Sequence, residues 1–283
     1  MMTRQFVCTV TSIVILAIPM AAAHGQTADV SSSPSDLASP TGHTILDHAI
    51  ERASIQDDSG IELAFEYIVE SAVESINGDG VVTETETARH RRYPLEGLLY
   101  DELIERDGRP LEEDDARKEK EKKSKFVREA RAHAARGEPY EPDEMNVRFD
   151  RKLMDRYNTR LVGTDMIRGL TCWVLSFEPR NGRLPDNRRI DKALNRSAGR
   201  LWIAQDDFGV ARISFEMQRP FRYLWGLIAT LRHVTGHFDF ERLDANLWVP
   251  TSFDLELDLR VFFRRIRRHI RQNWVEHRQI GTF

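Results

Sequence analysis

The sequence predicts an α+β fold that is mostly β and is built on one antiparallel sheet. Apolar and polar residues alternate over residues 247–263, which is typical of a sheet with one dry face and one wet face. Short strand-like segments also recur from residue 62 onward with turn signals between them. No strands alternate with crossover helices, so hairpins rather than parallel units should connect the strands.

Composition sets the broad class of protein. The chain has 283 residues, of which 41% are hydrophobic and 30% are charged, as in globular proteins with a developed core. Its net charge is -4, so the overall basic character of nucleic-acid-binding proteins is absent and no nucleic-acid partner is predicted. Cys172 lies in an apolar strand pattern, and we interpret it as a buried small hydrophobe.

Residues 1–23 have the features of a secretory signal peptide. Arg4 supplies positive charge, residues 6–19 form an apolar run, and Ala21–Ala23 provide small residues for cleavage. The run is short for a membrane-spanning helix of about 20 residues, which favours cleavage over an uncleaved anchor. A cut after Gly25 is an alternative. We therefore expect an exported chain without a lipid-modified cysteine.

A flexible leader is predicted over residues 24–42, which are rich in Ser, Pro, Thr, Ala and Gly. Residues 43–283 are interpreted as a single domain. This domain should open with a short helix for which Thr44 is the expected N-cap. The apolar residues of that helix fall on one stripe, formed by Ile45, Leu46, Ala49, Ile50 and Ala53.

Residues 62–76 fit either a strand or a helix. Glutamates recur every fourth residue, as on a helix, while Phe65, Tyr67 and Val69 share one face of a strand. The segment Asn77-Gly78-Asp79-Gly80 that follows is a strong hairpin signal. We therefore predict a strand here, paired with residues 81–89.

A charged helical insert is predicted at about residues 112–142. Acidic residues crowd its start, Lys and Arg follow through Arg136, and Gly137 is suited to end it. Because its apolar residues are few, we interpret it as a solvated helix that projects from the fold.

Further strands are expected at residues 98–105, 157–165, 170–178, 201–204 and 210–217. The alternation over residues 247–263 is unusually long. A straight strand of this length would reach about 56 Å at about 3.3 Å per residue. We therefore expect it to bend or to contain a bulge.

Three segments and the order of the elements resemble a known family. They are Asp107-Gly108-Arg109-Pro110-Leu111, the strand and turn over residues 199–209, and Leu247-Trp248-Val249-Pro250-Thr251. Over roughly residues 60–283 the chain resembles the LolA-like group of bacterial outer-membrane lipoprotein-sorting proteins and their exported relatives. The resemblance implies a strongly curved half-barrel covered by a few helices. It also implies a periplasmic, non-enzymatic protein that holds lipid or lipoprotein acyl chains on its concave face.

Inward-facing apolar residues of the predicted strands are the candidates for such a hydrophobic cavity. Each buried methylene contributes about 0.8 kcal/mol, so even one acyl chain supplies a substantial driving force. The alternative is that the same residues pack as an ordinary core beneath a helix. The candidates are Trp173, Leu175, Phe177, Ile213, Phe215, Phe253, Leu255 and Leu257.

Residues 260–271 are locally very basic. They would meet an anionic membrane surface or an acidic envelope partner, since each cation near such a surface contributes about 1 kcal/mol. Alternatively they form an outward strand face that pairs with acids of neighbouring strands. The candidates for this basic surface are Arg264, Arg265, Arg267 and Arg268.

No motif marks a catalytic, metal or cofactor site. His233 and His237 are spaced by four but lack the acid of a zinc-binding helix motif, and Asp206-Asp207 precede Phe208-Gly209 as in a turn. We therefore predict no catalytic residue, no metal and no cofactor. The alternative function is an envelope regulatory or scaffold protein that binds another protein through the same sheet.

Overall fold

The computed structural model describes residues 40–138, 140, 147–188, 190–223, 229–245 and 247–281. The predicted signal peptide, the leader up to residue 39 and residues 139, 141 and 142 of the predicted insert lie outside the described residues.

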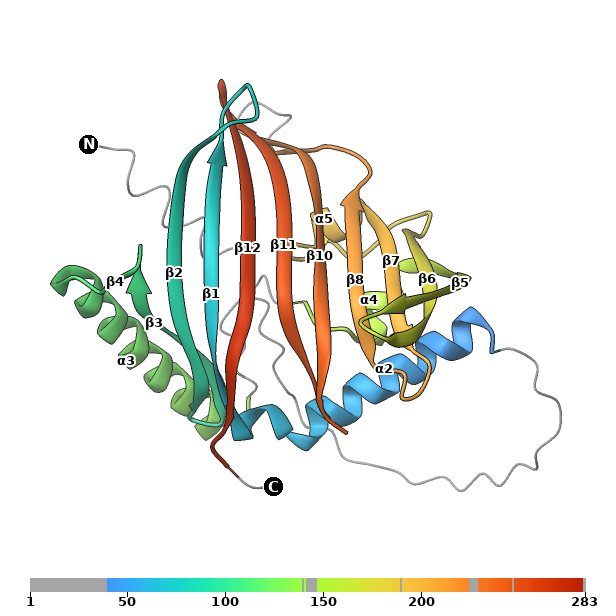
Figure 1. Cartoon of the computed structure of the whole chain (residues 1–283), viewed down its shortest axis with the longest axis horizontal. Coiled ribbons are helices and arrows are strands. Elements are labelled where there is room, and N and C mark those ends of the chain that lie inside the picture. The colour runs from blue at the N-terminus through green and yellow to red at the C-terminus, as the bar shows by residue number, and fades with distance from the viewer. Residues whose placement is uncertain are drawn as a thin grey trace.

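One antiparallel sheet forms the framework of the molecule (Figure 1). Its twelve strands within the described residues are β1 (Phe65–Ile76), β2 (Val82–Leu95), β3 (Leu98–Arg106), β4 (Arg109–Pro110), β5 (Tyr157–Ile167), β6 (Leu170–Pro179), β7 (Ser197–Ala204), β8 (Val210–Met217), β9 (Phe221–Tyr223), β10 (Ala229–Asp244), β11 (Leu247–Val261) and β12 (Arg264–Gln279). The order is β4-β3-β2-β1-β12-β11-β10-β8-β7-β6-β5, with β9 beside β10. The sheet is not closed into a barrel, and its antiparallel, mostly β character confirms the predicted fold class.

Helices flank this sheet. They are α2 (Gly42–Ser59), the 3₁₀ helix η2 (Ile61–Ala64), α3 (Glu113–Arg136), α4 (Arg151–Met154) and α5 (Asp191–Leu194). Figure 1 shows α2 crossing the lower end of the sheet from β1 towards β5, while α3 lies beside β3. None of the helices in the described residues is both long and apolar enough to span a membrane.

The predicted N-terminal helix is confirmed as α2, and the stripe that includes Ile45 and Ala49 is buried. The predicted N-cap was wrong. Thr41 has extended backbone angles and its hydroxyl oxygen accepts the backbone N–H of Thr44 at 3.2 Å. Thr44 therefore lies inside the first turn, and the helix starts earlier than its apolar stripe indicates. Gly60 ends the helix in the left-handed conformation.

The ambiguous segment is a strand, β1, as predicted. It pairs antiparallel with β2 on one side and with β12 on the other. The Asn77 carboxamide oxygen closes the hairpin by accepting the backbone N–H groups of Asp79 and Val81. The spacing of the glutamates by four therefore does not reflect a helix. Glu66 instead forms an ion pair across the sheet, at 2.6 Å from Arg91 on the neighbouring strand β2.

The charged insert forms α3 with the predicted end at Gly137, but the interpretation as a projecting helix was wrong. Phe126 and Ala130 are buried. The ring of Phe126 lies 4.9 Å from that of Tyr100 in β3, and the Tyr100 hydroxyl donates to Glu119 at 2.6 Å. A few well-placed contacts therefore fix one face of an otherwise solvated helix to the sheet.

The long C-terminal alternation contains one strand and a turn. β11 ends at Val261, Phe262 and Phe263 form the turn, and β12 follows. The expected irregularities occur in the pairing of β11 with β10, where the register shifts three times. Those shifts also interrupt the alternation of β10, a strand that the sequence patterns did not reveal.

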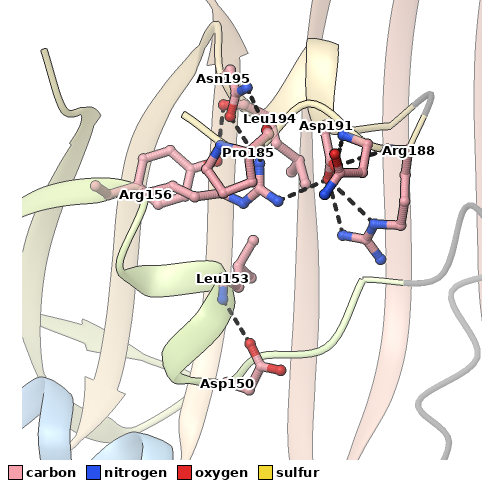
Figure 2. Close-up of polar contacts among 10 residues, drawn as sticks. Asp150, Leu153, Arg156, Pro185, Arg188, Asp191, Leu194 and Asn195 are labelled. Carbon is pink, nitrogen blue, oxygen red and sulfur yellow. Dashed lines mark hydrogen bonds and ion pairs between the residues drawn. The ribbon is translucent and has the colours of Figure 1, made fainter. Parts of the chain in front are cut away.

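A buried ion pair holds the connection between β6 and β7 (Figure 2). The Arg156 guanidinium donates to Asp191 at 2.9 Å, to the Pro185 carbonyl oxygen at 2.9 Å and to Asn195 at 2.8 Å. Both charged side chains are 2% exposed. Burial opposes ionisation of Asp191, but the backbone N–H of Arg188 and the charge of Arg156 lower its pKa on balance.

We expect Asp191→Asn to destabilise the protein by about 3–5 kcal/mol, because it leaves the buried Arg156 charge without its counterion. Urea unfolding followed by circular dichroism measures this loss. Glu138→Gln is the matched control, since its partner Arg136 is exposed and exposed pairs contribute about 0–1 kcal/mol. Equal unfolding midpoints for the two variants would contradict the structural role of the pair.

Candidate functional site

The strand register places the eight predicted cavity residues on one face of the sheet. Phe253 is opposite Phe238, which is opposite Ile213. Ile213 is opposite Leu201, which is opposite Leu175. Directly opposed residues point to the same side of a sheet, and so do residues two apart along a strand. The other five candidates follow from these pairings, and we call this side the apolar face.

One half of the apolar face lies beneath α2. Leu175 and Phe177 are buried in a cluster that includes Ile45 and Ile50 of that helix. Trp173 packs against the same cluster, with its ring 5.2 Å from that of Phe208. This is the packing of an ordinary core beneath a helix.

The other half forms a second cluster, which we call the sheet cluster. Its buried members come from β1, β10, β11 and β12, and no residue of a described helix belongs to it. They are Tyr67, Val69, Phe238, Phe253, Leu255, Ile270 and Trp274. Phe238 stacks on Phe253 with ring centroids 4.1 Å apart. Ile213 and Phe215 pack against both clusters, so the apolar face is continuous.

Exposure increases along the apolar face towards the turn between β11 and β12. Phe253 is 3% exposed and Leu255 is 8% exposed, whereas Leu257 is only partly buried. Partly buried aliphatic residues continue from Leu257 on four neighbouring strands. We call them the aliphatic strip: Val73, Leu231, Val234, Leu257, Leu259 and Ile266.

Polar groups gather at the end of α2. The Gln56 carboxamide donates to the Trp248 carbonyl oxygen at 2.9 Å and accepts the Trp248 backbone N–H at 2.8 Å. It also donates to Glu62 at 3.2 Å. Asp57 forms an ion pair with Arg148 at 3.5 Å. Through Gln56, this group joins α2 and η2 to the start of β11.

Two carboxyl groups at this end have raised pKa values. Burial, reinforced by the negative charge of Asp57, raises the pKa of Glu62 to about 7. Burial also raises the pKa of Asp57 to about 6, although Arg148 opposes this. Both acids therefore change charge close to neutral pH, where an ordinary carboxyl group stays ionised.

The four predicted basic residues differ in their surroundings. Arg265 forms an ion pair with Asp258 at 2.5 Å, which is the outward pairing left open as an alternative. Arg267 donates to the Gly78 carbonyl oxygen, and Arg268 donates to the Ser75 hydroxyl. Within the described ranges, Arg264, Arg267 and Arg268 form no ion pair with a carboxylate.

The sequence patterns missed a groove on the opposite side of the sheet. Its volume is about 580 Å³, and it crosses β7, β8, β10 and β11. Charged and polar side chains such as Arg200, Glu216 and Glu256 line it, which does not suit an acyl chain. Gly199 and Gly236 also line it, but both are opposite Phe215, and a Cβ on either would meet atoms of Phe215 rather than enter the groove.

These features define a protein with an open antiparallel sheet whose single apolar face is covered on one half by a helix. No family model matches the chain, and no curated protein matches it. It is similar to the crystal structure of a LolA superfamily protein from Nitrosomonas europaea, with 12% identity over 86% of this chain and 96% of that chain and a TM-score of 0.31.

A second similar structure is an outer membrane lipoprotein-sorting protein domain from Vibrio parahaemolyticus, with 10% identity, coverage of 84% and 95%, and a TM-score of 0.35. A third is the MucA/MucB complex of Pseudomonas aeruginosa, with 11% identity, coverage of 84% and 98%, and a TM-score of 0.23. The structures to which the chain is similar thus include LolA-like proteins, the group that the sequence resembles.

The raised pKa of Glu62 predicts how stability depends on pH. The folded chain binds more protons than the unfolded chain between pH 4.5 and about 7, so this group favours folding as the pH falls through that range. Glu62→Gln imitates the protonated form. We expect it to raise the free energy of unfolding at pH 7.5 by roughly 2–3 kcal/mol and by about half as much at pH 5.5.

Urea titrations of both proteins at the two pH values measure this difference. Glu121→Gln on the exposed side of α3 is the control, and it should change stability equally little at both pH values. A benefit of Glu62→Gln that is as large at pH 5.5 as at pH 7.5 would show that the Glu62 carboxyl group is not held near neutrality.

Proposed function

We propose that this chain is a periplasmic, non-enzymatic binding protein that holds acyl chains of lipid or lipoprotein on its apolar face. The observation that carries the proposal is the aliphatic strip. Its partly exposed side chains extend the buried sheet cluster towards solvent. No residue of a described helix belongs to the sheet cluster. Outer-membrane lipoprotein sorting is the process that such binding would serve.

The sheet cluster and the aliphatic strip offer the chemistry that an acyl chain requires. Leu257 packs against the sheet cluster and belongs to the aliphatic strip. A chain laid along the strip would therefore reach Leu255 and Phe253 by passing Arg268, which is opposite Leu257 on the same face and donates to the Ser75 hydroxyl. Each methylene transferred from water to this surface contributes about 0.8 kcal/mol, so micromolar binding, which requires about 8 kcal/mol, needs about ten of them before the cost of ordering the ligand is counted.

The part of the apolar face beneath α2 does not enter this proposal. Leu175 is completely buried against helix residues, so a ligand would reach it only after α2 moved away. The proposed ligand-contacting residues are therefore the partly buried Ile213, Phe215 and Leu257. Phe253 and Leu255 are buried within the sheet cluster, so a ligand would contact them only when the side chains of that cluster move apart.

The proposed location follows from residues 1–23. Their charged start, apolar run and small residues are those of an export signal, and a carrier of acyl chains between membranes would work in the periplasm. Detection of the chain starting at about residue 24 in a periplasmic extract tests this part separately from ligand binding.

The alternative is an envelope protein that binds another protein through the same face. The two alternatives differ in the mass of the molecule that stays bound to the purified chain. Native mass spectrometry of the chain beginning at residue 24 would show added lipid mass in the first case. In the second case it would show the mass of a polypeptide.

We expect Leu257→Asp to weaken binding of a fluorescent fatty acid at least tenfold, because it places a charge on the path of the acyl chain. Fluorescence titration of delipidated protein measures the dissociation constant. Met166→Asp is the matched control, since Met166 is an exposed apolar residue outside the strip. Uptake that is equal in the two variants, or absent in the unchanged protein, would refute the proposal.

A further inference from the structure

We propose that two neighbouring hairpin turns dock this protein on an anionic lipid bilayer. The turns are residues 77–81, between β1 and β2, and Phe262–Phe263, between β11 and β12. The inference goes beyond the proposed function because it assigns a membrane-contacting surface whether or not the apolar face carries a ligand.

The two turns lie side by side at one end of the sheet, the upper end in Figure 1. β1 pairs with β12, and Ile76 at the end of β1 is opposite Arg267 near the start of β12. The Arg267 guanidinium donates to the carbonyl oxygen of Gly78 in the adjacent turn. The turns therefore form one surface.

Large apolar side chains are exposed on both turns. Phe263 is fully exposed and Phe262 is 58% exposed. Val81 is also 58% exposed, and Val82 beside it is 45% exposed. Single exposed apolar residues are common on protein surfaces, but three on two adjacent turns, with Val82 next to them in β2, form a patch.

The backbone at Phe262 shows that an aromatic side chain is not the residue this turn would favour. Val261 pairs with Arg264, which leaves a hairpin turn of two residues. Phe262 has a φ of 52°, in the region that glycine and asparagine adopt readily. A bulky side chain therefore occupies a position where glycine would relieve strain and remove exposed apolar surface.

Cations surround this apolar patch. Arg264 follows Phe263 directly at the start of β12. Arg267 and Arg268 lie three and four residues further along the same strand. These three guanidinium groups form no ion pair with a carboxylate within the described residues, whereas Arg265 is neutralised by Asp258. The exposed acids Asp79 and Glu84 lie beside the two valines, so the positive charge is concentrated on the turn that carries the two phenylalanines.

An anionic bilayer matches both properties of this surface. Aromatic rings partition into the interface between headgroups and acyl chains, while guanidinium groups bind the phosphates above it. A protruding tip of two phenylalanines suits a deformable lipid surface, since it offers a rigid protein partner little contact area. The aliphatic strip ends at this same tip through Leu259 and Ile266, so docking would place the end of the strip at the membrane.

Vesicle co-sedimentation of the chain beginning at residue 24 tests the proposal. Vesicles of phosphatidylglycerol and phosphatidylcholine should bind the protein at least tenfold more tightly than vesicles of phosphatidylcholine alone, and less tightly as salt rises. Phe263→Ser combined with Phe262→Gly should lower binding at least tenfold without unfolding the protein, since both side chains are exposed. Arg264→Glu should lower it about fivefold or more.

Two matched controls keep the test specific. Met166→Ser removes an exposed apolar residue elsewhere, and Arg128→Glu reverses an exposed cation on α3. Neither should change vesicle binding by more than about twofold. Equal losses in the controls and the tip variants, or no preference of the unchanged protein for the anionic vesicles, would overturn the proposal.

The docking proposal and the acyl-binding proposal can be refuted independently of each other. The tip variants should bind the fluorescent fatty acid as tightly as the unchanged protein, while Leu257→Asp should still bind vesicles. Vesicle binding without fatty-acid uptake would support docking and refute the proposed carrier function. Uptake without vesicle binding would do the reverse.

Discussion

The pairing of β1 with β12 is the constraint on which the rest of the structure depends. It joins the N-terminal hairpin to the C-terminal strands over eleven paired residues and so makes one sheet from two distant parts of the chain. Its register sets Val69 opposite Trp274 and Val73 opposite Ile270. A slip of one residue would turn these side chains to the charged side of the sheet. The sheet cluster, the aliphatic strip and the neighbouring turns all require this register.

An apolar face of this length must be covered, and the chain covers its two halves differently. Over β6 and β7 the covering is α2, which Gln56 ties to the backbone of β11. Over β1, β12 and β11 no described helix enters the cluster, and exposure grows from Phe253 to Leu257. The same alternation in the sequence therefore produces a closed core in one place and a surface available to a ligand in another.

The sequence predicted those features that depend on the spacing of nearby residues. The stripe of α2, the hairpin after β1 and the shared face of the eight candidates follow from spacing and turn residues. β10 was missed because bulges break its alternation, and the turn at Phe262–Phe263 was missed because two apolar residues continue the pattern of β11. Which half of the apolar face α2 covers, and how strongly Glu62 is desolvated, depend on contacts between distant segments that no local spacing encodes.

The charges at the two ends of the apolar face give a bound amphiphile a direction. Glu62 and Asp57 gather where α2 ends, and an anionic headgroup there would raise the cost of ionising them further. Arg264 and Arg268 lie at the other end, beside the aliphatic strip and without a described carboxylate partner. On the proposed function, the tail would point towards Phe253 and the headgroup towards the arginines. The end of the sheet that contacts anionic headgroups in the bilayer would then also hold the headgroup of the ligand.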